Sequence, residues 1–326
     1  MDGGRRGWAT GVSVRPVGEP LRAAGLIRIA ETPGSRSDVV RRAARRDEVR
    51  RVRRGAYVGS DHWSGLDDTQ RHVVEIRAAL AALRSEAVVS HRSAAAVWDL
   101  PIVGRVAGGV HLTFLGRSGG SSRSELARHA VDEPLPQAVV DGVRVTSAAR
   151  TVVDLARHDG FLAGVAAGDA AVHRGLVAVD ELHAEVRAAG SRRGVRTARD
   201  VVAFVDGRSE SPGESLSRVR MHELALPVPQ LQHVVRDRDG FVGRVDFWWD
   251  EARVVGEFDG RAKYGIRGAA RAAADQLWDE KTREDRLRRT GVAVVRWTWA
   301  DAWRGGPMVE RLRRAGVGGP PRAHRS

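Results

Sequence analysis

Hydrophobic positions along this chain follow the helical period in some segments and form short continuous runs in others, which predicts a multi-domain α/β protein. Apolar residues recur at helical spacing in TQRHVVEIRAALAAL, SHRSAAAVWDLPI and TSAARTVVDLARHDG, so we expect amphipathic helices there. The runs GGVHLTFL and VAVVRWTW predict buried strands. With 326 residues, the chain can form two or three domains.

Composition and pattern along the chain predict three domains, with a flexible tail at each end. Residues 1–17 and 318–326 are rich in Gly, Pro and Arg and lack apolar periodicity, so we expect them to be flexible. The domains are expected at residues 18–65, 66–205 and 206–317. The last of these should contain a mixed sheet flanked by helices.

The first expected domain has the element order of a small winged helix. LRAAGLIRIA predicts a helix at residues 21–30, a second helix opens at Ser37, and EVRRVRRGAYV predicts a β-ribbon. In the second helix, Val39, Val40 and Ala43 are expected to face the core.

Arginines cover the rest of this helix and ribbon, and we expect them to contact DNA phosphates. Base contacts would come from the start of the helix, at Ser35, Arg36 or Ser37. The alternative is a solvated face enriched in arginine by a GC-rich genome, because only Lys263 and Lys281 among the 54 basic residues are lysine. The expected DNA-binding residues are Arg36, Arg41, Arg42, Arg45, Arg46, Arg51, Arg53 and Arg54.

Charge and composition favour a nucleic-acid partner. The net charge is +13 and the pI is about 11.3, which suits a polyanion. The sequence has no cysteine and no apolar run of the roughly 20 residues that span a bilayer, so we expect a cytoplasmic protein without a membrane partner.

The middle domain shows no recognisable catalytic motif. Its loop GRSGGSSRS does not match a phosphate-binding P-loop or a dinucleotide fingerprint. Four histidines there, His91, His111, His129 and His158, have no metal-ligand spacing with nearby acids, so we expect ordinary structural or surface histidines.

The segment GRVDFWWDEARVVGEFDG predicts a hairpin with acids on one side. If its turn centres on Glu251 and Ala252, Asp246 lies opposite Glu257 and Trp248 opposite Val255. Strand alternation then places Asp259 on the face of Glu257. The other face is expected to collect apolar residues, namely Val245, Phe247, Trp249, Val254 and Phe258.

Opposed carboxylates repel, and a divalent cation would neutralise them. Oxygen ligands favour Mg²⁺ or Mn²⁺, so Asp246, Glu257 and Asp259 are the expected metal ligands. The metal would activate a water molecule for attack on a phosphodiester. The ammonium of Lys263 or Lys281 would stabilise the developing negative charge. The alternative is an amphipathic hairpin with a solvated acidic face.

Glu214 has two interpretations. In SESPGESLSRVRMHELALP, Ser211 is an expected N-cap, Pro212 the first helical residue and Glu214 the acid of a capping box, which explains Glu214 structurally. The other interpretation is a catalytic or metal-assisting acid. Lys281 likewise lies four residues before Asp285, so these two could form a surface pair.

These pieces together resemble the PD-(D/E)XK nuclease superfamily, and more narrowly its very-short-patch-repair endonuclease-like domains. The resemblance rests on VDF at 245–247, EFDG at 257–260 and VVRW at 294–297, and it covers about 100 residues. It implies a restriction-endonuclease-like fold in which Asp246 and Glu257 bind metal and Glu214 is the helical acid. Asp259 stands where the superfamily usually has lysine, and RAKY replaces a histidine frequent in the narrower group.

The N-terminal half resembles the AbiEi-type antitoxin family. The likeness rests on VRRVRRGAYV at 49–58, SHRSAAAVWDLP at 90–101 and VTSAARTVVDLA at 145–156. It implies a winged-helix DNA binder followed by an α/β antitoxin-like domain, and a cognate toxin as a partner.

We therefore expect a DNA-binding protein with an Mg²⁺-dependent endonuclease-like C-terminal domain, acting in defence, DNA processing or a toxin-antitoxin setting. The alternative is a non-enzymatic transcriptional regulator or antitoxin in which the nuclease fold is degenerate.

Overall fold

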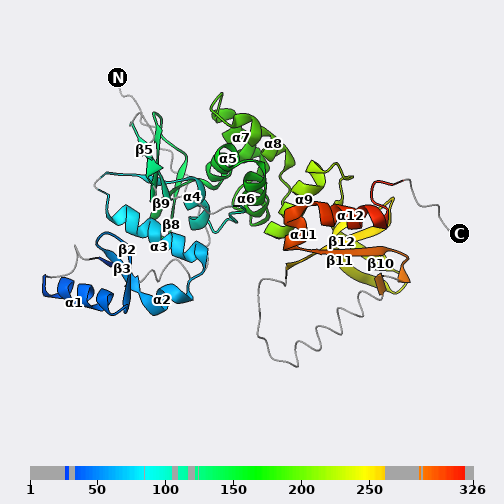
Figure 1. The fold of residues 1–326 in the computed structure, drawn as a ribbon. Helices are drawn as coiled ribbons and strands as arrows, with labels where there is room; N and C mark the ends of the chain where they lie inside the picture. Colours follow the sequence, from blue (N-terminus) through cyan, green and yellow to red (C-terminus); the bar gives the residue numbers. More distant parts are fainter. Residues whose placement is uncertain are drawn as a thin grey trace, which may run out of the picture. The chain divides into compact units, whose positions relative to one another are not determined.

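The chain folds into an α/β structure with two compact units (Figure 1). The computed structural model describes residues 26–28, 34–83, 85–104, 109–116, 122–123, 125–260, 286–287 and 289–319. Unit 1 comprises residues 1–100 and 106–151, and unit 2 comprises residues 101–105 and 152–326. The division falls inside helix α5 (Ala148–Asp159).

Unit 1 begins with a basic helix and a β-ribbon, as the sequence predicts. The elements are β1 (Ile27–Arg28), α1 (Gly34–Arg45), β2 (Val49–Arg53), β3 (Ala56–Gly59) and α2 (Ser60–Gly65), and the antiparallel sheet has the order β1-β3-β2.

Two expectations in this region are wrong. Ile27 and Arg28 lie in a strand and not in a helix, because Ile27 pairs with Tyr57 and adds a third strand to the ribbon. Val40 is buried, but Val39 is 50% exposed. Successive helical residues point about 100° apart, so the two neighbours do not face the core equally.

The rest of unit 1 is a six-stranded mixed sheet with helices. The sheet has the order β6-β7-β5-β4-β9-β8, and the predicted helices correspond to α3, α4 and α5. The elements are α3 (Asp68–Ala81), β4 (Val88–Val89), α4 (His91–Val97), β5 (Val110–Leu115), β6 (Ser122–Arg123), β7 (Leu126–Val131), β8 (Gln137–Val140) and β9 (Val143–Thr146). The central strand β5 is buried up to Phe114, as expected for GGVHLTFL.

Unit 2 contains helices α6 (Phe161–His173), α7 (Val179–Ala188), α8 (Val195–Phe204) and α9 (Pro212–Glu223). Gly164 allows close packing of α6, because a Cβ there would lie 2.7 Å from the Ala156 Cβ. The buried carboxylate of Asp169 ties α6 to α9 by accepting a hydrogen bond of 2.6 Å from Arg218.

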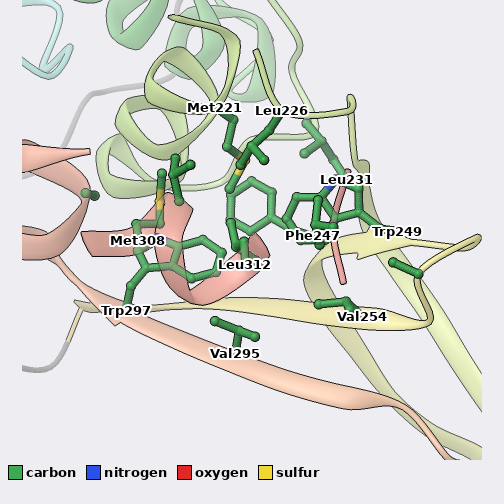
Figure 2. Close-up of a cluster of buried hydrophobic side chains, with 14 of the residues drawn as sticks. Met221, Leu226, Leu231, Phe247, Trp249, Val254, Val295, Trp297, Met308 and Leu312 are labelled. Carbon is green, nitrogen blue, oxygen red and sulfur yellow. The ribbon is translucent and has the colours of Figure 1, made fainter. Parts of the chain in front are cut away.

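The second half of unit 2 is a four-stranded sheet covered by helices. Strands β10 (Gln230–Asp237), β11 (Gly240–Trp249) and β12 (Val254–Asp259) are antiparallel, and β13 (Ala293–Thr298) pairs in parallel with β12. Helices α11 (Trp299–Arg304) and α12 (Gly306–Ala315) follow. Figure 2 shows Met221, Phe247, Met308 and Leu312 pointing toward one another in the core between the sheet and these helices.

No helix in the described part of the chain is long and apolar enough to cross a membrane.

Candidate functional site

The predicted register of the β11–β12 hairpin is confirmed. Trp248 lies opposite Val255 and Phe247 opposite Gly256. The backbone N–H of Arg253 donates to the carbonyl of Asp250 at 3.0 Å and closes the turn. The paired residues end at Phe247 and Gly256, so the predicted pair of Asp246 and Glu257 lies one position beyond the observed pairing.

The predicted separation of the two hairpin faces is only partly correct. Phe247, Trp249 and Val254 belong to the main core, with Phe258 packed against it. Val245 instead packs in a second cluster with Trp248 and Val255. The pairing of β10 with β11 keeps one register from Gln230 to Val235, and the register shift lies between Val235 and Arg236. Gln232 has a φ of 53°, in the left-handed region.

The acid-bearing side of the hairpin is partly covered and is not a simple solvated face. The second cluster also contains Leu287 and Val292, both buried. Asp246 and Glu257 are half-buried beside this cluster, whereas Asp259, at the end of β12, is exposed.

Protein groups already contact both central carboxylates. The Oδ2 atom of Asp246 accepts a hydrogen bond of 2.8 Å from the backbone N–H of Phe258. Glu257 accepts one of 2.9 Å from the Nε of Arg296, its cross-strand neighbour on β13. The Glu257 side chain is only 12% exposed, whereas that of Arg296 is 37% exposed, so the ion pair is only partly desolvated. Nothing in the sequence spacing identified Arg296 as a partner, because the pairing depends on a distant parallel strand.

Glu214 is buried in the first turn of α9, and Ser211 is its predicted N-cap. Its carboxylate accepts hydrogen bonds from the Ser211 hydroxyl (2.7 Å), the Glu210 backbone N–H (3.0 Å) and the Gln232 side-chain amide (2.9 Å). The reciprocal backbone bond therefore comes from Glu210, one residue before the position that a capping box uses. In the described residues, every hydrogen-bond donor to Glu214 is neutral.

Contacts made by Gln232 and Phe258 connect α9 with the sheet that bears the hairpin acids. Gln232 of β10, which donates to Glu214, lies between the residues paired with Phe247 and Val245. Asp246 in turn accepts from Phe258, the neighbour of Glu257. The ring of Phe258 lies against Gly213, where an added Cβ would be only 2.0 Å from it.

These acids nevertheless do not form a three-ligand metal group in the described part of the chain. In the described residues, one group of His, Asp or Glu side chains places three possible ligand atoms within 4.8 Å of one another. That group is His91, His111 and His129. The hydrogen bond to Phe258 and the ion pair with Arg296 hold Asp246 and Glu257 in other contacts. Lys263, Lys281 and Asp285 lie outside the described residues.

The arginines of α1 and the ribbon are mostly exposed. Arg41, Arg42, Arg45 and Arg46 on or just after α1, and Arg51 and Arg54 on the ribbon, have exposed side chains.

Arg53 differs from the other expected DNA contacts. Its side chain is 17% exposed and forms an ion pair of 3.3 Å with Glu125, so it joins the ribbon to the six-stranded sheet. The side chains of Ser35, Arg36 and Ser37 lie outside the described residues.

Unit 1 brings together three histidines that were expected to be unrelated. The rings of His91 and His129 stack with centroids 3.8 Å apart, and His111 Nδ1 lies 3.0 Å from His129 Nε2. Their sequence separations contain no ligand motif, because α4, β5 and β7 meet only through the sheet topology.

Comparisons with known proteins identify partial relatives. No protein-family model matches the chain. It is 32% identical over 156 residues to the uncharacterized proteins MT2308 and Rv2248 from two strains of Mycobacterium tuberculosis. The matched region covers 48% of this chain and 55% of each relative, so the chain spans about half the length of the curated relatives it matches.

Proposed function

We propose that the protein binds DNA through unit 1 and hydrolyses phosphodiesters with an endonuclease-like domain in unit 2 that uses Mg²⁺ or Mn²⁺. The observation that carries the proposal is the packing of α9, which bears Glu214, against β12, which bears Glu257: the Phe258 ring of β12 lies against Gly213 of α9. The Phe258 backbone N–H also donates to Asp246 of β11. DNA is the partner, with a cognate toxin as a second one, and the cytoplasm is the proposed compartment.

The element order around these acids supports a nuclease-type fold. Helix α9 is followed by the antiparallel strands β10, β11 and β12, and then by β13 in parallel with β12. The resemblance to PD-(D/E)XK nucleases rests on a helix with Glu214, strands with VDF and EFDG, a helix with Asp285 and a strand with VVRW. The elements α9, β11, β12 and β13 correspond to its described parts, and Asp285 lies outside the described residues.

The chemistry of the acids suits a hard divalent cation. Mg²⁺ typically takes one or two carboxylates and completes its coordination with water and substrate phosphate. Asp246 and Glu257 are the two proposed ligands, and Asp259 extends the negative charge toward solvent. When bound, the metal would polarise the phosphate and acidify the attacking water. Glu214 would orient the site through Gln232, and Lys263 or Lys281 would supply the ammonium.

Exposed arginines in unit 1 support DNA binding. A single helix and the adjoining ribbon carry Arg41, Arg42, Arg45, Arg46, Arg51 and Arg54 with exposed side chains. Guanidinium groups bind phosphate oxygens through charge-assisted hydrogen bonds, so this surface suits a duplex backbone.

The ion pair between Glu257 and Arg296 favours a second candidate function. A carboxylate neutralised by arginine needs no metal, which suits a transcriptional regulator or antitoxin whose nuclease fold no longer cuts. In that case unit 2 would serve for DNA or partner contact only.

Cleavage of supercoiled plasmid and single-stranded DNA, with and without Mg²⁺ or Mn²⁺, tests the first proposal. Wild type should cleave only with the divalent ion. Asp246→Asn keeps an oxygen for the Phe258 N–H but removes the charge. It should be at least about 100-fold slower, the scale for losing one electrostatic group of an active site. Glu251→Gln, at an exposed acid in the adjacent turn, should match wild type.

Intact substrates under all these conditions would refute the nuclease proposal. A promoter footprint that Glu257→Gln leaves unchanged, together with absent cleavage, would establish the regulator instead.

A further inference from the structure

Three histidines of unit 1 converge on one side of the six-stranded sheet. His111 lies on β5 and His129 on the neighbouring parallel strand β7, where His129 pairs in register with Thr113. His111 and Thr113 are two residues apart on the same strand and so point to the same face. His91 begins α4 directly after β4, which lies on the other side of β5.

The distances among these rings match a shared ligand. Ligand nitrogens of all three lie within 4.8 Å of one another. The His111 Nδ1 and His129 Nε2 atoms are 3.0 Å apart. A tetrahedral zinc ion with Zn–N bonds of about 2.0–2.1 Å holds its nitrogens roughly 3.4 Å apart. The His91 and His129 rings are stacked, so binding of one metal by all three residues requires these two rings to rotate until their nitrogens converge.

The surroundings of His91 resemble an outer coordination shell. The Ser90 hydroxyl lies 3.0 Å from His91 Nδ1 and itself accepts a hydrogen bond of 2.8 Å from Thr113. Such bonds orient a ligating imidazole, here with Nε2 as the ligand atom. His91 also has a φ of 52°, and strained backbone at a non-glycine residue is concentrated at functional sites.

The three histidines are largely buried. His91 is 9% and His111 5% exposed, and His129 is half-buried, so the cluster lies inside unit 1 with limited access. Metal binding uses the neutral form of imidazole.

We propose that His91, His111 and His129 form a binding site for a first-row transition metal of the zinc type. Imidazole nitrogen suits zinc, copper and nickel, whereas Mg²⁺ prefers oxygen, so this site differs in chemistry from the acids of unit 2. Three protein ligands leave a fourth coordination position for water or an anion. Three neutral ligands leave the ion's charge of two uncompensated, which favours an anion there.

Cobalt titration of the full chain, after removal of metal with a chelator, tests the site. Co²⁺ should bind once per chain with the visible absorption of tetrahedral coordination, and Zn²⁺ should displace it. Zn²⁺ should also raise the Tm, because it binds only the folded state. His129→Gln should weaken Co²⁺ binding by more than about 100-fold, beyond the usual effect of an outer-shell change. His62→Gln, at an exposed histidine of α2, should bind as wild type does.

A second variant keeps all three ligands. Thr113→Val removes the hydroxyl that positions Ser90, and it should weaken Co²⁺ binding by roughly 10- to 100-fold. This variant decides the matter if circular dichroism shows that His129→Gln does not fold. The proposal is overturned if wild type gives no tetrahedral cobalt spectrum and no Tm shift with Zn²⁺, or if folded His129→Gln binds with wild-type affinity.

Discussion

At the scale of single residues, Asp169 is a buried polar side chain of α6 that binds two residues of α9. It accepts hydrogen bonds from Arg218 (2.6 Å), the Ser215 hydroxyl (2.8 Å) and the Asp206 backbone N–H (2.8 Å). Burial raises the pKa of Asp169, and the guanidinium of Arg218 acts against that rise.

We predict that Asp169→Asn lowers the free energy of unfolding by about 3–5 kcal/mol, because it leaves the Arg218 charge buried without its counterion. Urea unfolding of the full chain measures the change. Asp239→Asn serves as a control, since its pair with Arg238 is wide, at 3.9 Å, and both side chains are largely exposed. Equal stability of the two variants would contradict the prediction.

At the scale of elements, the start of α11 is a helix N-terminus with a complete capping box. Thr298 is the N-cap, and the Asp301 carboxylate accepts hydrogen bonds from the Thr298 backbone N–H (3.0 Å) and from Arg311 (2.7 Å). The backbone bond from Thr298 lowers the pKa of Asp301, and Arg311 acts in the same direction.

This lowered pKa predicts a defined pH dependence. The stabilisation from Asp301 is complete above the unfolded-state pKa, about 3.9, and is lost as the pH falls through the lower folded-state pKa. Asp301→Asn should therefore be less stable than wild type near neutral pH, and the difference should shrink below about pH 4. Chemical unfolding of both proteins across this range measures it. A difference that grows on acidification would reverse the assigned sign.

Local sequence patterns predicted the elements whose structure depends on neighbouring residues. The hairpin register followed from a turn centred on Glu251 and Ala252, and the α9 N-cap from Ser211 with Pro212 behind it. Both depend on neighbours in sequence. The strand at Ile27 was missed because its partner Tyr57 lies beyond α1. The packing of Val245 was missed because its cluster includes Leu287 and Val292, which are distant in sequence.

The candidate sites depended even more on distant contacts. The acids Asp246 and Glu257 could be proposed from the hairpin alone, but the Arg296 pair depends on β13. The histidine cluster joins three elements that no local pattern connects.

At the scale of the whole molecule, the net charge of +13 matters for DNA binding because exposed arginines are concentrated on α1 and the ribbon. We predict that duplex DNA binding weakens steeply with salt. Arg45→Ala should reduce the slope of log K against log salt by about 1, the value for one lost phosphate contact. Fluorescence anisotropy at several salt concentrations measures the slope.

A matched control is Arg187→Ala, which removes an exposed arginine from α7 in unit 2. It should leave the slope unchanged. An equal loss for both variants would mean that overall charge, and not the α1 surface, governs binding.

The parallel pairing of β12 with β13 has a consequence for how the protein is made. During translation, β12 leaves the ribosome well before β13, since residues 260–292 are synthesised between them. Throughout that interval the backbone groups of β12 that later pair with β13 have no strand partner. They can pair with strands of other nascent chains. Chains truncated before residue 293 should accordingly accumulate in inclusion bodies.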